Sequence, residues 1–127
     1  MIDIDYIMDL IDWNKNECDQ EKGIKLAKKV QSINVFLQPC DKKHNKNVWE
    51  NCAKILSERD DEELEPYLSE LMKWLQDMNW PGAYCILDRL QKFKKDTWFE
   101  FIFESSIKKA KLLDDEVWED NLRMIEK

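Results

Sequence analysis

The sequence predicts an all-α protein: a short curved stack of antiparallel helix hairpins, with about six to seven helices. Apolar residues recur at helical spacing along most of the 127 residues. The chain is 43% apolar, which is enough to bury a core. Its two glycines and three prolines are too few for the many tight turns of an all-β protein. We therefore expect residues 1–127 to form a single helical-repeat domain.

The clearest hairpin lies between residues 64 and 93. Its first helix has a stripe of apolar residues at helical spacing, Leu64, Tyr67, Leu68, Leu71, Trp74, Leu75 and Met78. The second helix has another, Ala83, Ile86, Leu87, Leu90 and Phe93. Asn79 tolerates a left-handed backbone, and Pro81 suits the first turn of a helix. These two residues predict the turn between the helices, with Trp80 at its corner.

The N-terminal half contains three predicted helices, over residues 3–13, 18–32 and 48–58. The first is expected to bury an apolar face made of Tyr6, Ile7, Leu10 and Ile11. Gly23 in the second predicts a close helix crossing. A single helical turn is expected before Pro39, followed by an exposed loop over residues 41–47. Asn47 is predicted to cap the third helix.

In the C-terminal half, Asp60 or Asp61 is expected to start a helix that continues to Asp77. Asp96 or Thr97 is expected to cap a long helix that reaches residue 113, although residues 98–103 would also suit a strand. Apolar residues at helical spacing, expected to face the core, continue along that helix to Leu113. A final helix over residues 115–126 is expected to bury its apolar residues, Val117, Trp118, Leu122 and Ile125.

The net charge of −7 argues against nucleic acid or an anionic membrane as the direct partner. It favours a basic protein partner, or serves solubility alone. The N-terminal residues lack the basic start and apolar run of a signal peptide, and no apolar stretch is long enough to span a membrane. The four cysteines form no CxxC pair. We therefore expect a cytoplasmic protein with reduced thiols, Cys52 and Cys85 on apolar helix faces and Cys18 and Cys40 in loops or at helix edges.

Residues that could perform catalysis are not apparent. The single histidine, His44, lies in a lysine-rich loop without a neighbouring acid or nucleophile. Two isolated glycines exclude a phosphate-binding loop or a dinucleotide fingerprint, and the scattered cysteines do not predict a metal site. We therefore expect no enzyme activity, no metal and no cofactor. The six tryptophans mostly fall on apolar stripes, and Trp80 is the best candidate for partial exposure at an interface.

The strongest charge feature is the acidic segment that contains Asp60, Asp61, Glu62 and Glu63. One interpretation is a solvated helix start, because carboxylates favour the positive end of a helix dipole. The other is an acidic surface for a cationic partner. We take these four residues as the first candidates for partner binding. The hairpin corner, Asp77, Asn79 and Trp80, is the second.

Three stretches, Val48–Ala53, Leu64–Leu68 and Trp74–Ala83, resemble small bacterial HEAT-like helical-hairpin domains that are otherwise of unknown function. The similarity covers roughly residues 45–92 and is most specific in the third stretch. It implies the fold, a curved stack of antiparallel helix pairs. Some domains of this kind resemble immunity proteins of contact-dependent growth inhibition and related polymorphic toxin systems, which bind and neutralise a cognate toxin domain, often a nuclease. Toxin-contacting residues do not transfer by motif.

The resemblance, the acidic charge and the missing catalytic residues together lead to a functional expectation. The protein is expected to be an immunity protein that neutralises a basic, nuclease-type toxin by covering its active site or a nearby surface. The alternative is a helical-repeat adaptor that binds a peptide or another cytoplasmic protein along its concave face. An enzyme with an unprecedented site is a more distant third. The sequence does not identify the toxin, its substrate or the oligomeric state.

Overall fold

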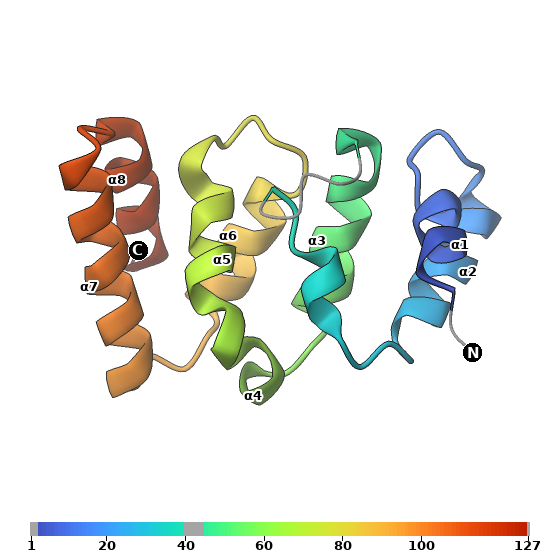
Figure 1. The fold of residues 1–127 in the computed structure, drawn as a ribbon, viewed down its shortest axis with the longest axis horizontal. Coiled ribbons are helices and arrows are strands. Elements are labelled where there is room, and N and C mark those ends of the chain that lie inside the picture. Colours follow the sequence, from blue (N-terminus) through green and yellow to red (C-terminus); the bar gives the residue numbers. More distant parts are fainter. Residues whose placement is uncertain (1–2, 40–44, 127) are drawn as a thin grey trace.

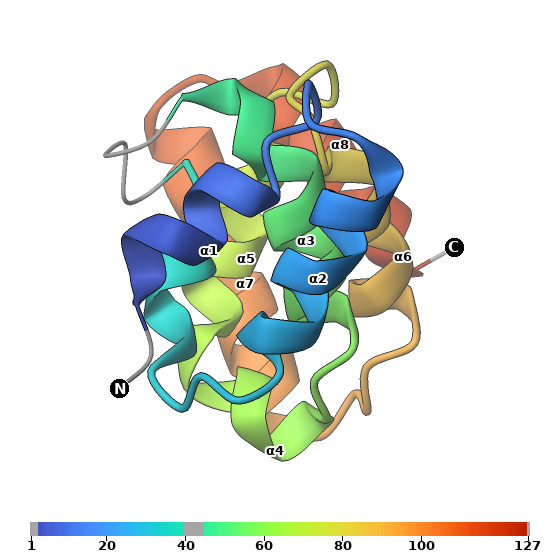
Figure 2. The same ribbon diagram turned by 90° about the vertical axis from the view of Figure 1, so that its right-hand side faces the viewer.

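A computed structural model describes residues 3–39 and 45–126 as an all-helical stack (Figure 1). Four helix pairs lie side by side. These are α1 (Ile4–Leu10) with α2 (Glu17–Ala27), the 3-10 helix η1 (Ile33–Phe36) with α3 (Trp49–Ser57), α5 (Leu68–Lys73) with α6 (Ala83–Gln91), and α7 (Thr97–Leu112) with α8 (Glu116–Arg123). Viewed from the α1–α2 end, the later pairs lie behind one another (Figure 2).

Short elements complete the stack. They are η2 (Lys46–Val48), α4 (Asp61–Leu64), η3 (Glu65–Tyr67), η4 (Trp74–Gln76) and η5 (Met124–Glu126). Elements α4, η3, α5 and η4 follow one another directly and form one interrupted helix. When these four are counted as one and the other 3-10 helices are left out, the described part of the chain has seven helices; it has no strand. The predicted all-α helical-hairpin fold is confirmed, and residues 98–103 are helical rather than extended.

Side-chain caps start most of the α-helices. At each of these starts the side chain of an Asp or Asn accepts a hydrogen bond from a backbone N–H of the first helical turn. The capping residues are Asp3, Asn16, Asp60, Asp96 and Asp115. The predicted starts at Asp60 and Asp96 are therefore confirmed. The predicted cap at Asn47 is wrong, because Asn45 caps η2 and its side chain accepts the Asn47 N–H.

Three predicted helices are shorter or less regular than expected. The helix predicted over residues 3–13 ends at Leu10, and the one predicted over residues 18–32 ends at Ala27. The helix predicted from Asp60 or Asp61 to Asp77 is interrupted by η3, which contains Pro66. Proline has no N–H to donate, so a regular helical hydrogen bond is missing at this position.

The corner between η4 and α6 depends on Gly82 rather than on Asn79 or Pro81. Gly82 has φ +86° and precedes α6 directly. A Cβ atom there would lie 2.7 Å from Ala53 Cβ and 3.0 Å from the Trp49 carbonyl oxygen, so only glycine fits. Among the described residues only Asp114 and Gly82 have positive φ, and Pro81 lies before the helix rather than in its first turn. The two predicted turn roles are therefore wrong.

The core follows the predicted apolar stripes with three exceptions. Tyr6, Leu113 and Val117 were expected inside and are exposed. Tyr6 and Val117 each precede a buried residue by one position, which turns them about 100° away from the buried face of the helix. Leu113 lies just beyond the end of α7. The close crossing predicted at Gly23 is confirmed, because a Cβ atom there would lie 2.6 Å from Ile11 Cγ2.

The cysteines on the described part of the chain differ in exposure. Cys52 is buried, Cys85 is half-buried beside Ser57, and Cys18 is exposed on α2. Burial raises the pKa of the Cys85 thiol, which keeps it in the neutral form. Cys40, His44 and most of the loop predicted over residues 41–47 lie outside the described residues.

Candidate functional site

The acidic segment predicted to bind a partner makes extensive contacts within the fold. Asp60 caps α4 by accepting the Glu63 N–H at 2.8 Å. Asp61 accepts a hydrogen bond from Arg89 Nη2 at 2.6 Å and another from the Lys94 N–H at 3.0 Å. Partial burial opposes ionisation of this carboxyl, but these two hydrogen bonds outweigh it and lower the pKa of Asp61. Asp61 therefore ties α4 to α6 and to the turn after it.

Glu63 takes part in a second set of contacts. Its carboxylate lies 2.8 Å from Arg59 Nη1. The Nη2 of the same arginine donates to the carbonyl oxygens of Ala27 at 2.9 Å and Val30 at 2.8 Å, just where α2 ends. Arg89 also donates to the Arg59 carbonyl oxygen at 2.9 Å. We call Arg59, Asp61, Glu63 and Arg89 the acidic clamp, because together they hold the ends of α2, α4 and α6.

The acidic clamp leaves less of the acidic segment available to a partner than the sequence suggests. Two of the four carboxylates of the segment, Asp61 and Glu63, are already paired with arginines. Asp60 and Glu62 remain exposed. The segment thus combines both interpretations of the sequence: it starts a helix, and part of its charge faces solvent.

The hairpin corner lies far from the acidic segment. In Figure 1 the turn that contains residues 77–82 is at the top of the stack and α4 is at the bottom. Asp77 accepts the Asn79 N–H at 2.8 Å, and Asn79 is exposed. Trp80 is half-buried, as predicted, with its ring edge-on to Trp49 at a centroid distance of 5.6 Å. The structure does not bring the two predicted groups of binding residues together.

A different surface carries most of the exposed apolar side chains. Among the described residues eight large apolar side chains are exposed, and five of them lie on α7, α8 or the turn between them: Trp98, Phe101, Leu112, Leu113 and Val117. Trp98 and Phe101 stack on each other with centroids 5.6 Å apart. Phe101 is 59% exposed and Leu112 is 85% exposed. We call these five side chains the α7 face.

The α7 face is a product of helix periodicity. Trp98, Phe101 and Leu112 fall on one side of α7. The buried residues Phe99, Phe103 and Ala110 fall on the other. Helices α7 and α8 form the end of the stack opposite α1 and α2 (Figure 1), so none of the other described hairpins lies on that side. This surface was not predicted from the sequence, because Leu113 and Val117 were expected in the core and the opposite side of α7 was not considered.

Acidic residues outnumber basic ones in the terminal hairpin that carries the α7 face. Residues 97–126 contain eight carboxylates against four cationic side chains. Asp114, Asp115 and Glu116 lie in or beside the α7–α8 turn, next to Leu113 and Val117. This terminal hairpin is therefore both apolar and acidic on its surface.

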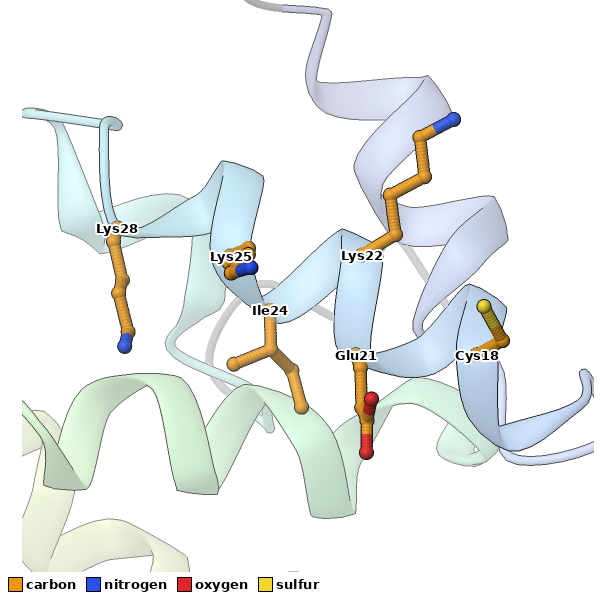
Figure 3. Close-up of a pocket in the computed structure, with 6 residues that line it drawn as sticks. All are labelled: Cys18, Glu21, Lys22, Ile24, Lys25 and Lys28. Atoms are coloured by element: carbon orange, nitrogen blue, oxygen red, sulfur yellow. The ribbon is translucent and has the colours of Figure 1, made fainter.

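An open groove of about 480 Å³ lies along α2, lined by Cys18, Glu21, Lys22, Ile24, Lys25 and Lys28. Figure 3 shows that Glu21, Ile24 and Lys28 point toward α3, whereas Cys18 and Lys22 point to the opposite side of α2. Because these side chains diverge, they do not present converging groups to one ligand.

Neither a metal site nor a membrane span is found on the described residues. Across residues 3–39 and 45–126, His, Cys, Asp and Glu form no group of three or more that could hold a metal ion. None of the helices in these ranges is long and apolar enough to cross a membrane.

Comparison with known proteins gives a family. No curated protein and no solved structure matches the chain. A family described as a domain of unknown function, DUF5071, matches residues 37–124, which is more than half of the chain. This range contains α3 to α8 and includes both the acidic clamp residues near α4 and the α7 face. The chain therefore belongs to the DUF5071 family of domains of unknown function.

Proposed function

We propose that this protein is a cytoplasmic immunity protein that binds and neutralises a basic toxin domain, of the nuclease type, by covering its active site or a nearby surface. The observation that carries the proposal is the α7 face, an exposed apolar surface bordered by carboxylates at the end of the stack. Exposed aromatic side chains in contact with each other, with Trp among them, are typical of protein-binding surfaces.

The aromatic pair on α7 is well suited to anchor a partner. Trp98 and Phe101 already stack on each other in the unbound protein. Their rings therefore lose little conformational freedom on binding, and more of the contact energy appears as affinity. Leu112 extends the same side of α7 toward the turn.

The charge of the terminal hairpin fits a basic partner. A nuclease domain that contacts a phosphate backbone is usually basic. The eight carboxylates within residues 97–126 would attract such a domain and speed its association. Asp60 and Glu62 add to this field from α4, and Asn79 and Trp80 at the hairpin corner provide a second contact region in this proposal.

The test is capture of the partner from the cells that make this protein, with tagged wild-type protein and two variants as baits. The Phe101→Ser variant removes an exposed aromatic ring from the α7 face. The Tyr84→Ser variant is a matched control, because Tyr84 is 68% exposed on α6. We expect the wild type and Tyr84→Ser to recover one basic protein in stoichiometric amount, and Phe101→Ser to lose it.

A second step tests neutralisation itself. The captured protein should stop growth when it is expressed alone and become harmless when this chain is co-expressed. Several weakly bound proteins, recovered equally by all three baits, would instead support the helical-repeat adaptor. A single partner that is not toxic would also contradict the immunity proposal.

A further inference from the structure

A pocket of about 580 Å³ lies near the hairpin corner, and Trp80 is the one lining residue that it shares with the proposed protein interface. Side chains from α3, from the interrupted helix and its following turn, and from η2 and α7 line it. The ones that matter here are Lys46, Trp49, Lys73, Gln76, Trp80 and Lys109. We call this site the lysine pocket. Its volume lies within the range of small-molecule binding sites.

Three lysines line the lysine pocket of a chain whose net charge is −7. They come from three separate elements: Lys46 from η2, Lys73 from the end of α5 and Lys109 from α7. The ion pairs formed within residues 3–39 and 45–126 involve none of these three lysines. Like charges that share one pocket repel each other, and a bound anion would relieve that repulsion.

A residue that lines the pocket has a hydrogen-bond donor without an acceptor. Trp49 is only 5% exposed, and within the described residues its buried indole N–H has no partner. The other buried indoles are satisfied, because Trp74 Nε1 donates to the Pro81 carbonyl at 3.0 Å and Trp118 Nε1 donates to the Met72 carbonyl at 3.0 Å. A buried donor left unpaired is costly and unusual in native proteins. An acceptor bound beside Trp49 would remove this cost.

Two pocket side chains lie against the Trp49 ring. The Lys46 ammonium is 5.6 Å from the centroid of that ring, and the half-buried Trp80 ring packs edge-on to it. The Lys46 side chain is long and flexible, so it can reach an anion bound beside Trp49.

We propose that the lysine pocket binds a small phosphorylated molecule of about nucleotide size. Its phosphate oxygens would pair with Lys46, Lys73 and Lys109 and accept the Trp49 indole N–H. Lysine ammonium groups act as point charges that suit phosphate oxygens. The half-buried Trp80 ring offers a surface on which a planar base can stack. A multiply charged phosphate matches three cations better than a single carboxylate does. This inference does not depend on the proposed toxin partner.

The test is a titration followed by NMR of the six indole N–H groups at low salt, with the Trp49 signal assigned from a Trp49→Phe variant. The probes are ADP, pyrophosphate, adenosine and a hexaglutamate peptide. We expect ADP and pyrophosphate to shift the Trp49 N–H signal while those of Trp74 and Trp118 stay in place. Adenosine, which has no phosphate, should bind at least tenfold more weakly than ADP.

Two neighbouring lysines on α7 provide a matched pair of variants. Lys109→Gln removes a pocket charge, whereas Lys108→Gln removes the same charge from an exposed position that does not line the pocket. We expect Lys109→Gln to raise the Kd for ADP at least fivefold and Lys108→Gln to change it less than twofold.

Several results would overturn the inference. One is a Trp49 signal that no phosphate compound moves, and another is equal weakening by the two lysine variants. Equal binding of adenosine and ADP would remove the phosphate from the recognition. Binding of hexaglutamate without binding of either phosphate compound would assign the pocket to an acidic segment of a protein partner.

Discussion

The acidic segment at residues 60–63 and the outer side of α7 differ in what their side chains already contact. In the acidic segment, Asp61 and Glu63 are bonded to arginines that in turn hold the ends of other helices. On α7, Trp98 and Phe101 contact each other and are exposed to solvent. Half of the carboxylates in the segment that is most conspicuous in the sequence thus form ion pairs within the fold. The less conspicuous helix has exposed aromatic side chains that none of the other described elements covers.

This comparison shows that a run of like charges is weak evidence for a binding site until its internal partners are known. Arg59 and Arg89 are enough to change the interpretation of the run. Arg89 is distant in sequence from Asp61, and Arg59 is close to Glu63 but distant from the Val30 carbonyl to which it also donates. Exposed aromatic rings are stronger evidence, because exposing them brings the fold no benefit.

The largest effect on stability is expected from Arg59. Arg59→Met removes the donor to the Ala27 and Val30 carbonyls and leaves Glu63 without its arginine. We expect the free energy of unfolding to fall by about 3 kcal/mol, because hydrogen bonds from charged groups are the strong ones. Urea denaturation measures this, with Lys54→Met on the exposed side of α3 as the control. A loss no larger than that of the control would show that the clamp does not hold α2.

Asp61→Asn is expected to cost less and to depend on pH. The loss should be about 1–2 kcal/mol at neutral pH, because Asn cannot form the charged pair with Arg89. The folded-state pKa of Asp61 is lowered, so the charged form stabilises the folded state. The full stability difference between wild type and variant should therefore be present above about pH 4 and disappear as the pH falls through the lowered folded pKa.

Unfolding curves of both proteins at a series of pH values test this dependence. The matched control is Glu62→Gln, which removes one exposed carboxylate beside Asp61. A stability difference that stays constant, or that grows as the pH falls, would contradict the role of the Asp61–Arg89 pair.

Association rates should respond moderately to the exposed carboxylates of the acidic segment. In the double variant Asp60→Asn/Glu62→Gln, we expect the rate constant for binding the captured partner to fall by about twofold to threefold at low salt. The difference should vanish at high salt, because surface charges are then screened. Stopped-flow measurements at several salt concentrations test this. A change in the dissociation rate instead would place the segment inside the interface.

The smallest effect on stability is expected on α7. Phe101→Ser removes an exposed ring, so the free energy of unfolding should stay within about 0.5 kcal/mol of the wild type. Trp98→Ser should behave in the same way. A decrease of more than 2 kcal/mol in the free energy of unfolding of either variant would mean that the aromatic pair stabilises the fold and is not primarily a binding surface.

The helices could be predicted from the sequence because their signals are local. Asp96 caps a helix whose start lies next to it, and the stripe from Leu64 to Leu75 repeats every three or four residues. The turn between η4 and α6 was predicted to depend on Asn79 and Pro81 rather than on Gly82. The close approach of Ala53, which requires glycine at this position, is a tertiary contact that the local sequence does not show. Val117 was placed inside because it is apolar and next to a buried tryptophan, although the helix turns it outward.

The candidate sites were less predictable, since they combine residues from distant segments. The pairing of Asp61 with Arg89 cannot be recognised from either residue alone. The lysine pocket joins Lys46, Lys73 and Lys109 from three elements, and no local pattern marks them as neighbours. The α7 face, by contrast, could have been found from the sequence. Trp98, Phe101 and Leu112 lie opposite the buried residues on a helical projection.

The most direct test of the central claim is a quantitative comparison of partner capture by three baits: wild type, Phe101→Ser and Asp60→Asn/Glu62→Gln. We expect Phe101→Ser to recover less than about a tenth of the partner, as for an anchor worth at least 1.4 kcal/mol. The acidic variant should recover nearly as much as the wild type at physiological salt. The reverse result, with capture lost only in the acidic variant, would contradict the claim and place the interface on the acidic segment.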